Sequence, residues 1–292
     1  GRCAGLNERT LATPAQPIVR LGQEYVMCVR KAKFPIIMRW ISKQQTTASQ
    51  TSLRFSVLTT MVLAGIFIAG QAANLARAES IDDAGLWWAF FGQGEIGQHH
   101  ESCTYNRLKW WFDGHSRFLD DADGFNQSIV RPGLGISISE RAALWAGYGW
   151  IRTSPLSGPD FDEHRIWQQW TWSASHDPFA FALRSRLEQR FIETGDDTGW
   201  RFRQLVRAQY TFPCNPCRTA VVWDELFIHL NDTDWGAHDG VNQNRLFVGL
   251  GIKRDLQGRR RTEIGYLNQT INVAGKDNRM HHILSINVYR RP

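Results

Sequence analysis

The sequence predicts an all-β fold: a closed antiparallel transmembrane β-barrel of 10–12 strands with a lumen rich in Arg and Glu. After residue 80, polar and apolar residues alternate in segments of about ten residues or more. These segments exceed the roughly five or six residues typical of strands and suit a tilted membrane crossing of about 10 residues. Aromatic residues, which favour the headgroup layers, are abundant on the apolar face and near segment ends, among them Trp87, Trp88, Trp110, Trp150, Trp200 and Tyr289.

The N-terminal part differs from the rest of the chain in charge. Residues 1–78 hold ten Lys or Arg and two acids, whereas residues 79–292 hold 24 Lys or Arg against 26 Asp or Glu. The formal net charge of +6 therefore belongs to the N-terminal part. This distribution gives no support for nucleic acid as a partner, because a nucleic-acid site needs a basic surface on the folded domain.

A targeting segment is expected before the barrel. Basic residues precede an uncharged apolar run of 16 residues at 55–70, and Ala76-Arg77-Ala78 places small residues just before Glu79. This order predicts a secretory signal peptide over residues 38–78, cleaved near Ala78, since the run is short for a transmembrane helix of about 20 residues. Residues 1–37 show no periodicity and are expected to be a non-native or upstream-translated extension. The remaining residues, 79–292, form the predicted barrel of a Gram-negative outer membrane.

Eleven segments of the exported part carry the alternation, and Gly-rich or polar turns separate them. They are 86–96, 107–118, 124–138, 141–152, 163–174, 179–193, 200–212, 219–230, 242–254, 259–271 and 281–290. Bacterial barrels normally have an even strand number. Segment 86–96 is therefore expected to be an extra strand with an unseen partner, or an inserted piece that does not span. A soluble β protein with its apolar face on a core is the alternative fold.

The exported part has three cysteines, Cys103, Cys214 and Cys217. An oxidising compartment favours a turn disulfide between the C-x-x-C pair, Cys214 and Cys217. Zinc needs about four ligands, and no second pair is present. We therefore expect a disulfide, no metal site and no cofactor.

Five short runs carry a family resemblance. In order they are EHRIWQQ at 163–169, RLEQRF at 186–191, WDELF at 223–227, NQNRLF at 242–247 and GYLNQ at 265–269. Together they resemble the bacterial family catalogued as domain of unknown function 2490, over about residues 85–290. The resemblance implies an outer-membrane β-barrel and no settled activity. The chain departs from the usual barrel ending, because Arg290-Arg291-Pro292 follows Tyr289 where barrels commonly finish on an aromatic residue.

The alternation places one set of charged residues on the inward face. The set comprises Glu163, Arg165, Arg186, Glu188, Arg190, Arg201, Arg203, Arg207, Glu225, Arg245, Arg261 and Glu263. Cations outnumber carboxylates, and guanidinium groups stay charged while gripping two oxygens at once. Two interpretations remain open: an ionic network that plugs the lumen, or a site or narrow pore that attracts small anions.

The sequence predicts a barrel without assigned catalytic residues, either structural or a narrow anion-attracting conduit. One alternative is an envelope hydrolase acting on lipid or peptide at the barrel rim, for which Asp160-x-Asp162-x-His164 is the candidate acid–base group. The other is a surface-binding or adhesion barrel that uses its loops. The expected partners are outer-membrane lipids, the barrel-assembly machinery and a small anionic solute.

Overall fold

The computed structural model describes residues 80–96, 107–255, 258–273 and 278–291. The expected extension 1–37, the expected signal peptide 38–78 and Cys103 lie outside the described residues. Within this part of the chain, no helix is long and apolar enough to cross a membrane.

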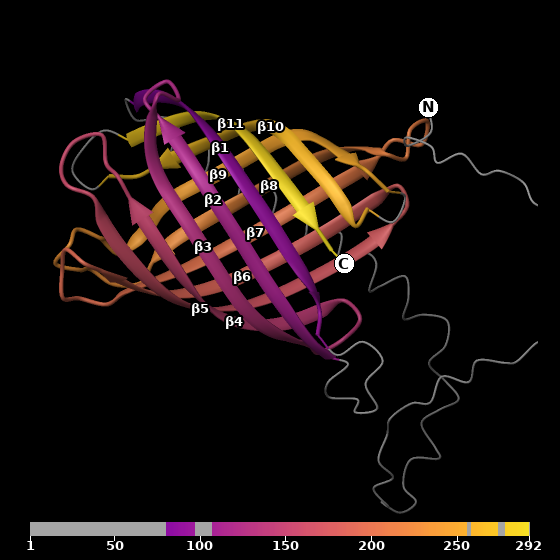
Figure 1. Ribbon diagram of the computed structural model, residues 1–292, viewed down its shortest axis with the longest axis horizontal. Helices are drawn as coiled ribbons and strands as arrows, with labels where there is room; N and C mark the ends of the chain where they lie inside the picture. Colours follow the sequence, from indigo (N-terminus) through magenta and orange to yellow (C-terminus); the bar gives the residue numbers. More distant parts are fainter. Residues whose placement is uncertain (1–79, 97–106, 256–257, 274–277, 292) are drawn as a thin grey trace, which may run out of the picture. The chain divides into compact units, whose positions relative to one another are not determined.

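Eleven strands make up the described part of the fold and form a closed barrel (Figure 1). They are β1 (Ser80–Glu95), β2 (Leu108–Leu119), β3 (Gly124–Ser137), β4 (Ala142–Thr153), β5 (Phe161–His176), β6 (Phe179–Ile192), β7 (Gly199–Thr211), β8 (Arg218–His229), β9 (Gly240–Lys253), β10 (Arg260–Ile271) and β11 (Asn278–Arg290). The all-β barrel of 10–12 strands predicted from the sequence is confirmed.

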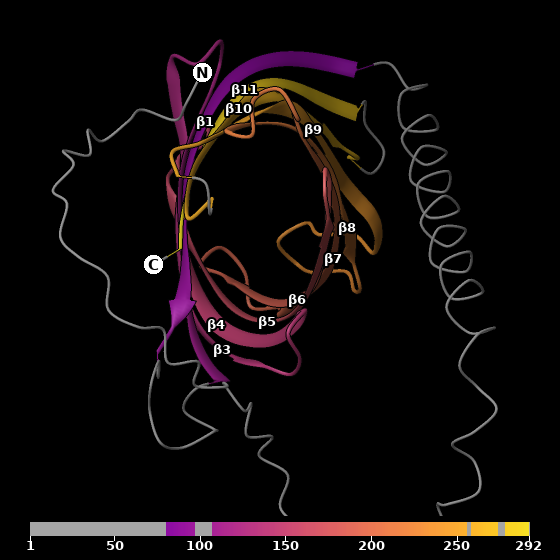
Figure 2. The same ribbon diagram turned by 90° about the vertical axis from the view of Figure 1, so that its right-hand side faces the viewer.

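The barrel closes through one parallel pair of strands, β1 and β11 (Figure 2). Ser80 lies beside Asn278 and Gly92 beside Arg290, while the other edge of β1 pairs antiparallel with β2. With an odd number of alternating strands, the first and last run in the same direction, so closure requires one parallel pair. A parallel ladder also satisfies the backbone hydrogen bonds.

The strand pairs are antiparallel as predicted, apart from the closing pair β1–β11. The expectation for segment 86–96 is wrong, because it is neither unpartnered nor an insertion: residues 86–95 belong to β1, which is paired on both sides. Alternation identifies a strand, but it carries no information about which strand lies next to it. The expectation of an even number rested on how bacterial barrels usually close, and this chain closes differently.

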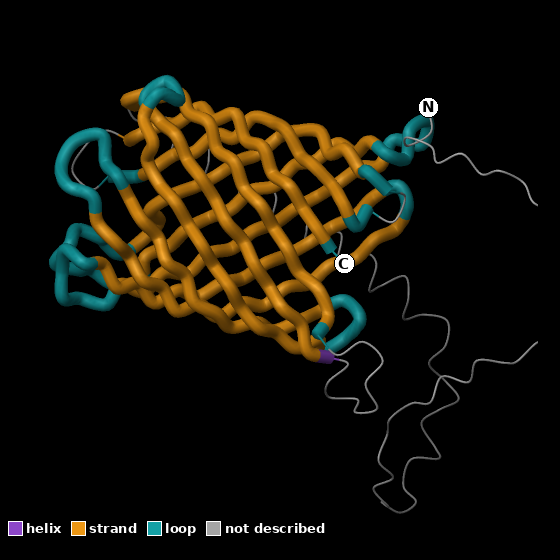
Figure 3. Tube along the Cα trace, viewed as in Figure 1, coloured by secondary structure: helices purple, strands orange, loops and turns teal. Residues whose placement is uncertain are grey.

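The connections gather at the two ends of the barrel (Figure 3). One end, named here the loop end, carries the connections 120–123, 154–160, 193–198 and 230–239. The opposite end, named the C-terminal end, carries the shorter connections 138–141, 177–178 and 212–217 and the end of β11.

The two surfaces of the wall have opposite polarity. Along β9, Leu246, Val248 and Leu250 are exposed, whereas Arg245 and Phe247, which alternate with them, are buried. The same alternation in the other strands leaves an apolar outer surface and a charged interior. A soluble β protein has the reverse arrangement, with its apolar face on the core.

Some polar side chains occur on the outer surface of β5–β9, and they bond to one another across neighbouring strands. The pairs are Gln168 with Gln189, Ser185 with Gln204, and Asn244 with Asp224. Gln168 and Gln189 donate to each other, whereas Ser185 donates to Gln204 and Asn244 donates to Asp224. Each pair thus meets part of its hydrogen-bonding need within the wall.

Inward glycines make room for a tryptophan that supports the charged interior. A Cβ at Gly133 or Gly147 would collide with the Trp167 ring, which is fully buried. The guanidinium of Arg186 lies over the same ring, with its Cζ 4.6 Å from the ring centroid. The glycines of β3 and β4 therefore determine where the charged side chains of β6 can lie.

We expect Gly147→Ala to lower the free energy of unfolding by about 1–3 kcal/mol, because the added methyl overpacks the interior. The Cβ would also meet the carbonyl oxygen of Pro132, which cannot move aside cheaply. Gly114→Ala is the matched control, since its nearest neighbours lie 3.7 Å away. Denaturant unfolding in detergent measures both variants, and equal stabilities would contradict the packing argument.

Candidate functional site in the barrel lumen

Nine arginines and five carboxylates are buried among the described residues. The arginines are Arg117, Arg131, Arg165, Arg186, Arg190, Arg201, Arg203, Arg207 and Arg245, and the acids are Asp113, Glu163, Glu188, Glu225 and Glu263. Two further arginines, Arg184 and Arg261, are partly buried and pair with Glu225 and Glu263. Burying a charged group is costly, and ion pairs and hydrogen bonds offset this cost for most of these side chains.

Glu188 is the centre of the largest group of ion pairs. Its carboxylate accepts from Arg201 Nη2 at 2.6 Å and from Arg203 Nη1 at 2.7 Å. Arg186 and Arg131 approach it at 3.7 and 4.0 Å. These arginines come from β3, β6 and β7, so a single carboxylate connects strands that are not neighbours in the wall.

Arg203 extends this group to the next carboxylate. Its Nη2 donates to Glu225 at 2.7 Å, and Arg184 Nη2 donates to the same oxygen at 2.7 Å. Two charge-assisted hydrogen bonds to two different carboxylates hold Arg203 in one orientation.

Three smaller groups surround the centre. Glu163 accepts from Arg165 and Arg190, each with a shortest distance of 2.6 Å. Glu263 pairs with Arg207 and with Arg261, the latter at 2.7 Å. Asp113 accepts from Arg131 at 2.7 Å, from Trp111 at 2.7 Å, and pairs with His115 at 2.8 Å.

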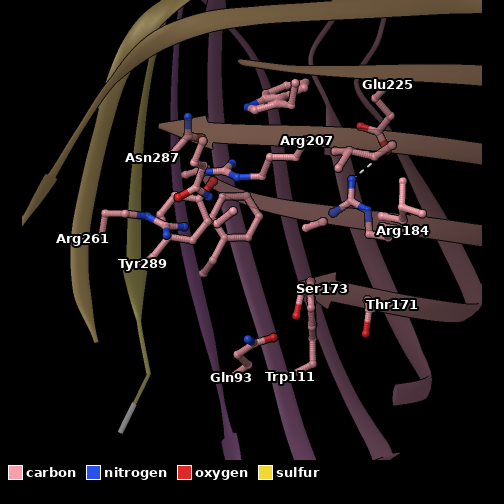
Figure 4. Close-up of a pocket in the computed structure, with 18 of the residues that line it drawn as sticks. Gln93, Trp111, Thr171, Ser173, Arg184, Arg207, Glu225, Arg261, Asn287 and Tyr289 are labelled. Carbon is pink, nitrogen blue, oxygen red and sulfur yellow. Dashed lines mark hydrogen bonds and ion pairs between the residues drawn. The ribbon is translucent and has the colours of Figure 1, made fainter. Parts of the chain in front are cut away.

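The lumen contains two cavities of about 640 and 350 Å³. The larger faces the C-terminal end, where Arg207, Arg261 and Tyr289 gather on one wall opposite Thr171 and Ser173 (Figure 4). The smaller faces the loop end and is lined by His229 and Trp235, among others. Both cavities therefore present guanidinium groups to any solute that enters.

Five residues line both cavities and are named here the dividing layer: Trp87, Arg117, Arg131, Arg203 and Arg245. Four of the five are arginines. Arg131 and Arg203 hold ion pairs, whereas among the described residues Arg117 and Arg245 hold none. The layer between the cavities is therefore the place where positive charge is least compensated.

The comparisons with known proteins identify the family. The family model described as a protein of unknown function, DUF2490, matches residues 84–281. The chain belongs to the DUF2490 family. An uncharacterized protein of Methylorubrum extorquens is 30% identical over 235 residues, which cover 80% of this chain and 98% of that protein. The solved structure of the NanC porin has a TM-score of 0.40 and 13% identity, covering 68% of this chain and 93% of that one.

The structure of this DUF2490 barrel places all twelve charged residues singled out from the sequence in the interior. Eleven of them take part in ion pairs, and Arg245 is the exception. Asp113, Arg117, Arg131 and Arg184 were not included in that set. The same period-two alternation along their strands is the signal that could have placed them on the inner face. Trp87 and Tyr289, assigned to the aromatic girdle, instead line the larger cavity.

The predicted disulfide between Cys214 and Cys217 is wrong. Cys214 is an exposed free thiol, whereas Cys217 is disulfide-bonded. Spacing in the sequence brings two cysteines close, but a bridge also requires Cβ directions that converge. Among the described residues, no group of three or more His, Cys, Asp or Glu is arranged to hold a metal.

The candidate hydrolase group does not assemble in this DUF2490 barrel. Arg152 holds Asp162 at 3.1 Å and Asp160 at 3.3 Å, and the ring of His164 bonds to the Tyr148 hydroxyl. No hydrogen bond joins either acid to His164 among the described residues. The arrangement has no acid oriented to help a histidine move a proton.

A loop partly covers the smaller cavity. Trp235 in the 230–239 connection lines this cavity, and the Cζ of Arg190 lies 4.9 Å from its ring centroid. The Asp234 carboxylate accepts from the backbone amides of Asp196 at 2.8 Å and Asp197 at 3.2 Å. Both bonds lower the pKa of Asp234, and the bond from the Asp196 amide has the larger effect. They hold the 230–239 connection against the 193–198 connection.

We expect Glu188→Gln to destabilise the barrel by about 3–5 kcal/mol, because it leaves buried guanidinium groups without their common carboxylate. Asp162→Asn is the control, since its pair with Arg152 is partly exposed and is worth at most about 1 kcal/mol. Equilibrium unfolding in detergent measures both. A Glu188→Gln barrel as stable as the control would show that the network is not needed for folding.

The hydrogen bonds to Asp234 should persist from neutral pH down to about pH 4, which is close to the pKa of an unperturbed aspartate. Because folding lowers the pKa of Asp234, these bonds contribute their full stabilisation at pH values above the pKa of Asp234 in the unfolded chain. This contribution is lost as the pH falls through the lower pKa of Asp234 in the folded protein. At pH 7, Asp234→Ala should speed hydrogen exchange of the 196 and 197 amides. Asp239→Ala, an exposed residue of the same loop, should leave it unchanged, and equal exchange in both variants would contradict the assignment.

Proposed function

We propose that this protein is a bacterial outer-membrane β-barrel that attracts small anions into its lumen and conducts them through a narrow dividing layer. The proposed location is supported by the wall itself. Its outer surface is apolar, polar groups on that surface pair with one another, and its backbone closes without a free strand edge. Outer-membrane lipids and the barrel-assembly machinery are the partners that such a barrel requires.

One observation carries the proposed anion preference. Among the described residues, the eleven interior arginines named above outnumber the five interior carboxylates, and the two of them without an ion pair lie in the layer shared by both cavities. A narrow, poorly hydrated passage lined by uncompensated guanidinium groups favours anions and excludes cations.

The ionic network and the conduit are compatible. The paired arginines brace the wall, because each carboxylate connects two or more strands. The two cavities remain beside these pairs. The network therefore accounts for the stability of the interior, and the unpaired arginines account for its selectivity.

Purified protein in planar bilayers under a KCl gradient should give reversal potentials that favour chloride. Arg245→Glu should weaken or reverse this preference, because it places a carboxylate in the dividing layer. Arg152→Glu carries the same change of charge at the loop end, 39% exposed, and should leave the preference unchanged. Cation preference, or absence of current from folded protein, would contradict the conduit and leave a structural role.

A further inference from the structure

We propose that the dividing layer contains a binding site for a small oxyanion, a carboxylate or phosphate group. The site is formed by the guanidinium groups of Arg117 and Arg245 and the indole N–H of Trp87. The inference deepens the proposed function and rests on it, because the ligand reaches these residues through the lumen.

Both arginines stack on the same indole. The Cζ of Arg117 lies 4.1 Å from the centroid of the Trp87 ring, and that of Arg245 lies 4.8 Å from it. Arg245 also lies over Phe227 at 4.6 Å. The aromatic faces attract the two cations through their ring quadrupoles, without neutralising them.

Neutral groups position both arginines, and neither forms an ion pair among the described residues. Arg117 Nη1 donates to the Gln127 carboxamide oxygen at 2.8 Å, and Gln127 in turn donates to Thr153 at 2.9 Å. Arg245 donates to the Gln243 carboxamide oxygen, with Nη2 at 2.9 Å, in the amide orientation that satisfies both ends of that side chain. A glutamine fixes the direction of each guanidinium without neutralising its charge.

Two buried donors in this cluster have no hydrogen-bond acceptor among the described residues: Trp87 Nε1 and Arg117 Nε. Trp87 is 7% exposed and Arg117 is 9% exposed. A buried donor without a partner is unfavourable, and an exposed one would be solvated instead. The cluster thus offers acceptor-seeking N–H groups beside two uncompensated charges.

An oxyanion matches this combination better than a halide. Carboxylate and phosphate carry several oxygens, so one group can accept from a planar guanidinium fork and from the indole at once. Its charge also offsets the repulsion between Arg117 and Arg245. Since both residues line both cavities, a ligand can approach from either side.

Calorimetric titration of the folded full-length chain in detergent tests the site, with inorganic phosphate and acetate as probes and chloride as the comparison. Arg117→Gln and Arg245→Gln should each weaken binding by about 10–100-fold, the usual effect of losing a hydrogen bond to a charged group. Trp87→Phe keeps the ring and removes its donor, so it should weaken binding by about tenfold. Arg152→Gln removes the same charge outside the lumen and should bind as the unaltered protein does.

The outcomes separate this site from conduction. Saturable oxyanion binding that depends on these residues, in a protein without current, supports the site and contradicts the conduit. Anion-selective current with no oxyanion binding supports the conduit and contradicts the site. Binding that is unchanged in Arg117→Gln, Arg245→Gln and Trp87→Phe, or no tighter than that of chloride, overturns the proposal. Heat-modifiable electrophoretic mobility establishes that each variant is folded. If an arginine variant does not fold, the binding measured for Trp87→Phe still tests the proposed site.

Discussion

Closure of the strand ladder is the constraint on which this structure depends. The parallel pairing of β1 with β11 removes the last free edge, so every strand has hydrogen-bonded neighbours on both sides. Once the wall is closed, its inner face is shielded from the surroundings of the outer face. One face can therefore be apolar while the other holds eleven arginines. A single unpaired edge would break this separation, because its backbone groups would need other partners.

Within the closed wall, the interior is organised by size as well as charge. The glycines of β3 and β4 leave a recess for the Trp167 ring, and that ring supports the Arg186 guanidinium. Glu188 then gathers arginines from several strands. The result is a wall braced from inside by ion pairs, in which the cost of burying each charge is offset by several hydrogen bonds.

The two arginines outside this pairing scheme give the lumen its chemical character. Arg131 and Arg203 are held by carboxylates, whereas Arg117 and Arg245 are held by glutamines and by the Trp87 ring. The difference in partner decides how much positive charge remains available between the two cavities. Most of the interior arginines therefore stabilise the barrel, whereas we propose that Arg117 and Arg245 attract anions.

Period-two alternation was sufficient to predict the barrel class, the eleven alternating segments and the inward position of the charged set, since it fixes which face each side chain occupies. The family followed from short runs around residues such as Glu188 and Arg245. The tertiary structure settled the rest, because neighbours in space are not encoded by alternation: the parallel closure, the bonding states of Cys214 and Cys217, and the placement of Trp87 inside the lumen. It also decided which arginines find carboxylates. That outcome depends on the stagger between strands far apart in the sequence, and it sets Arg117 and Arg245 apart from arginines with the same local pattern.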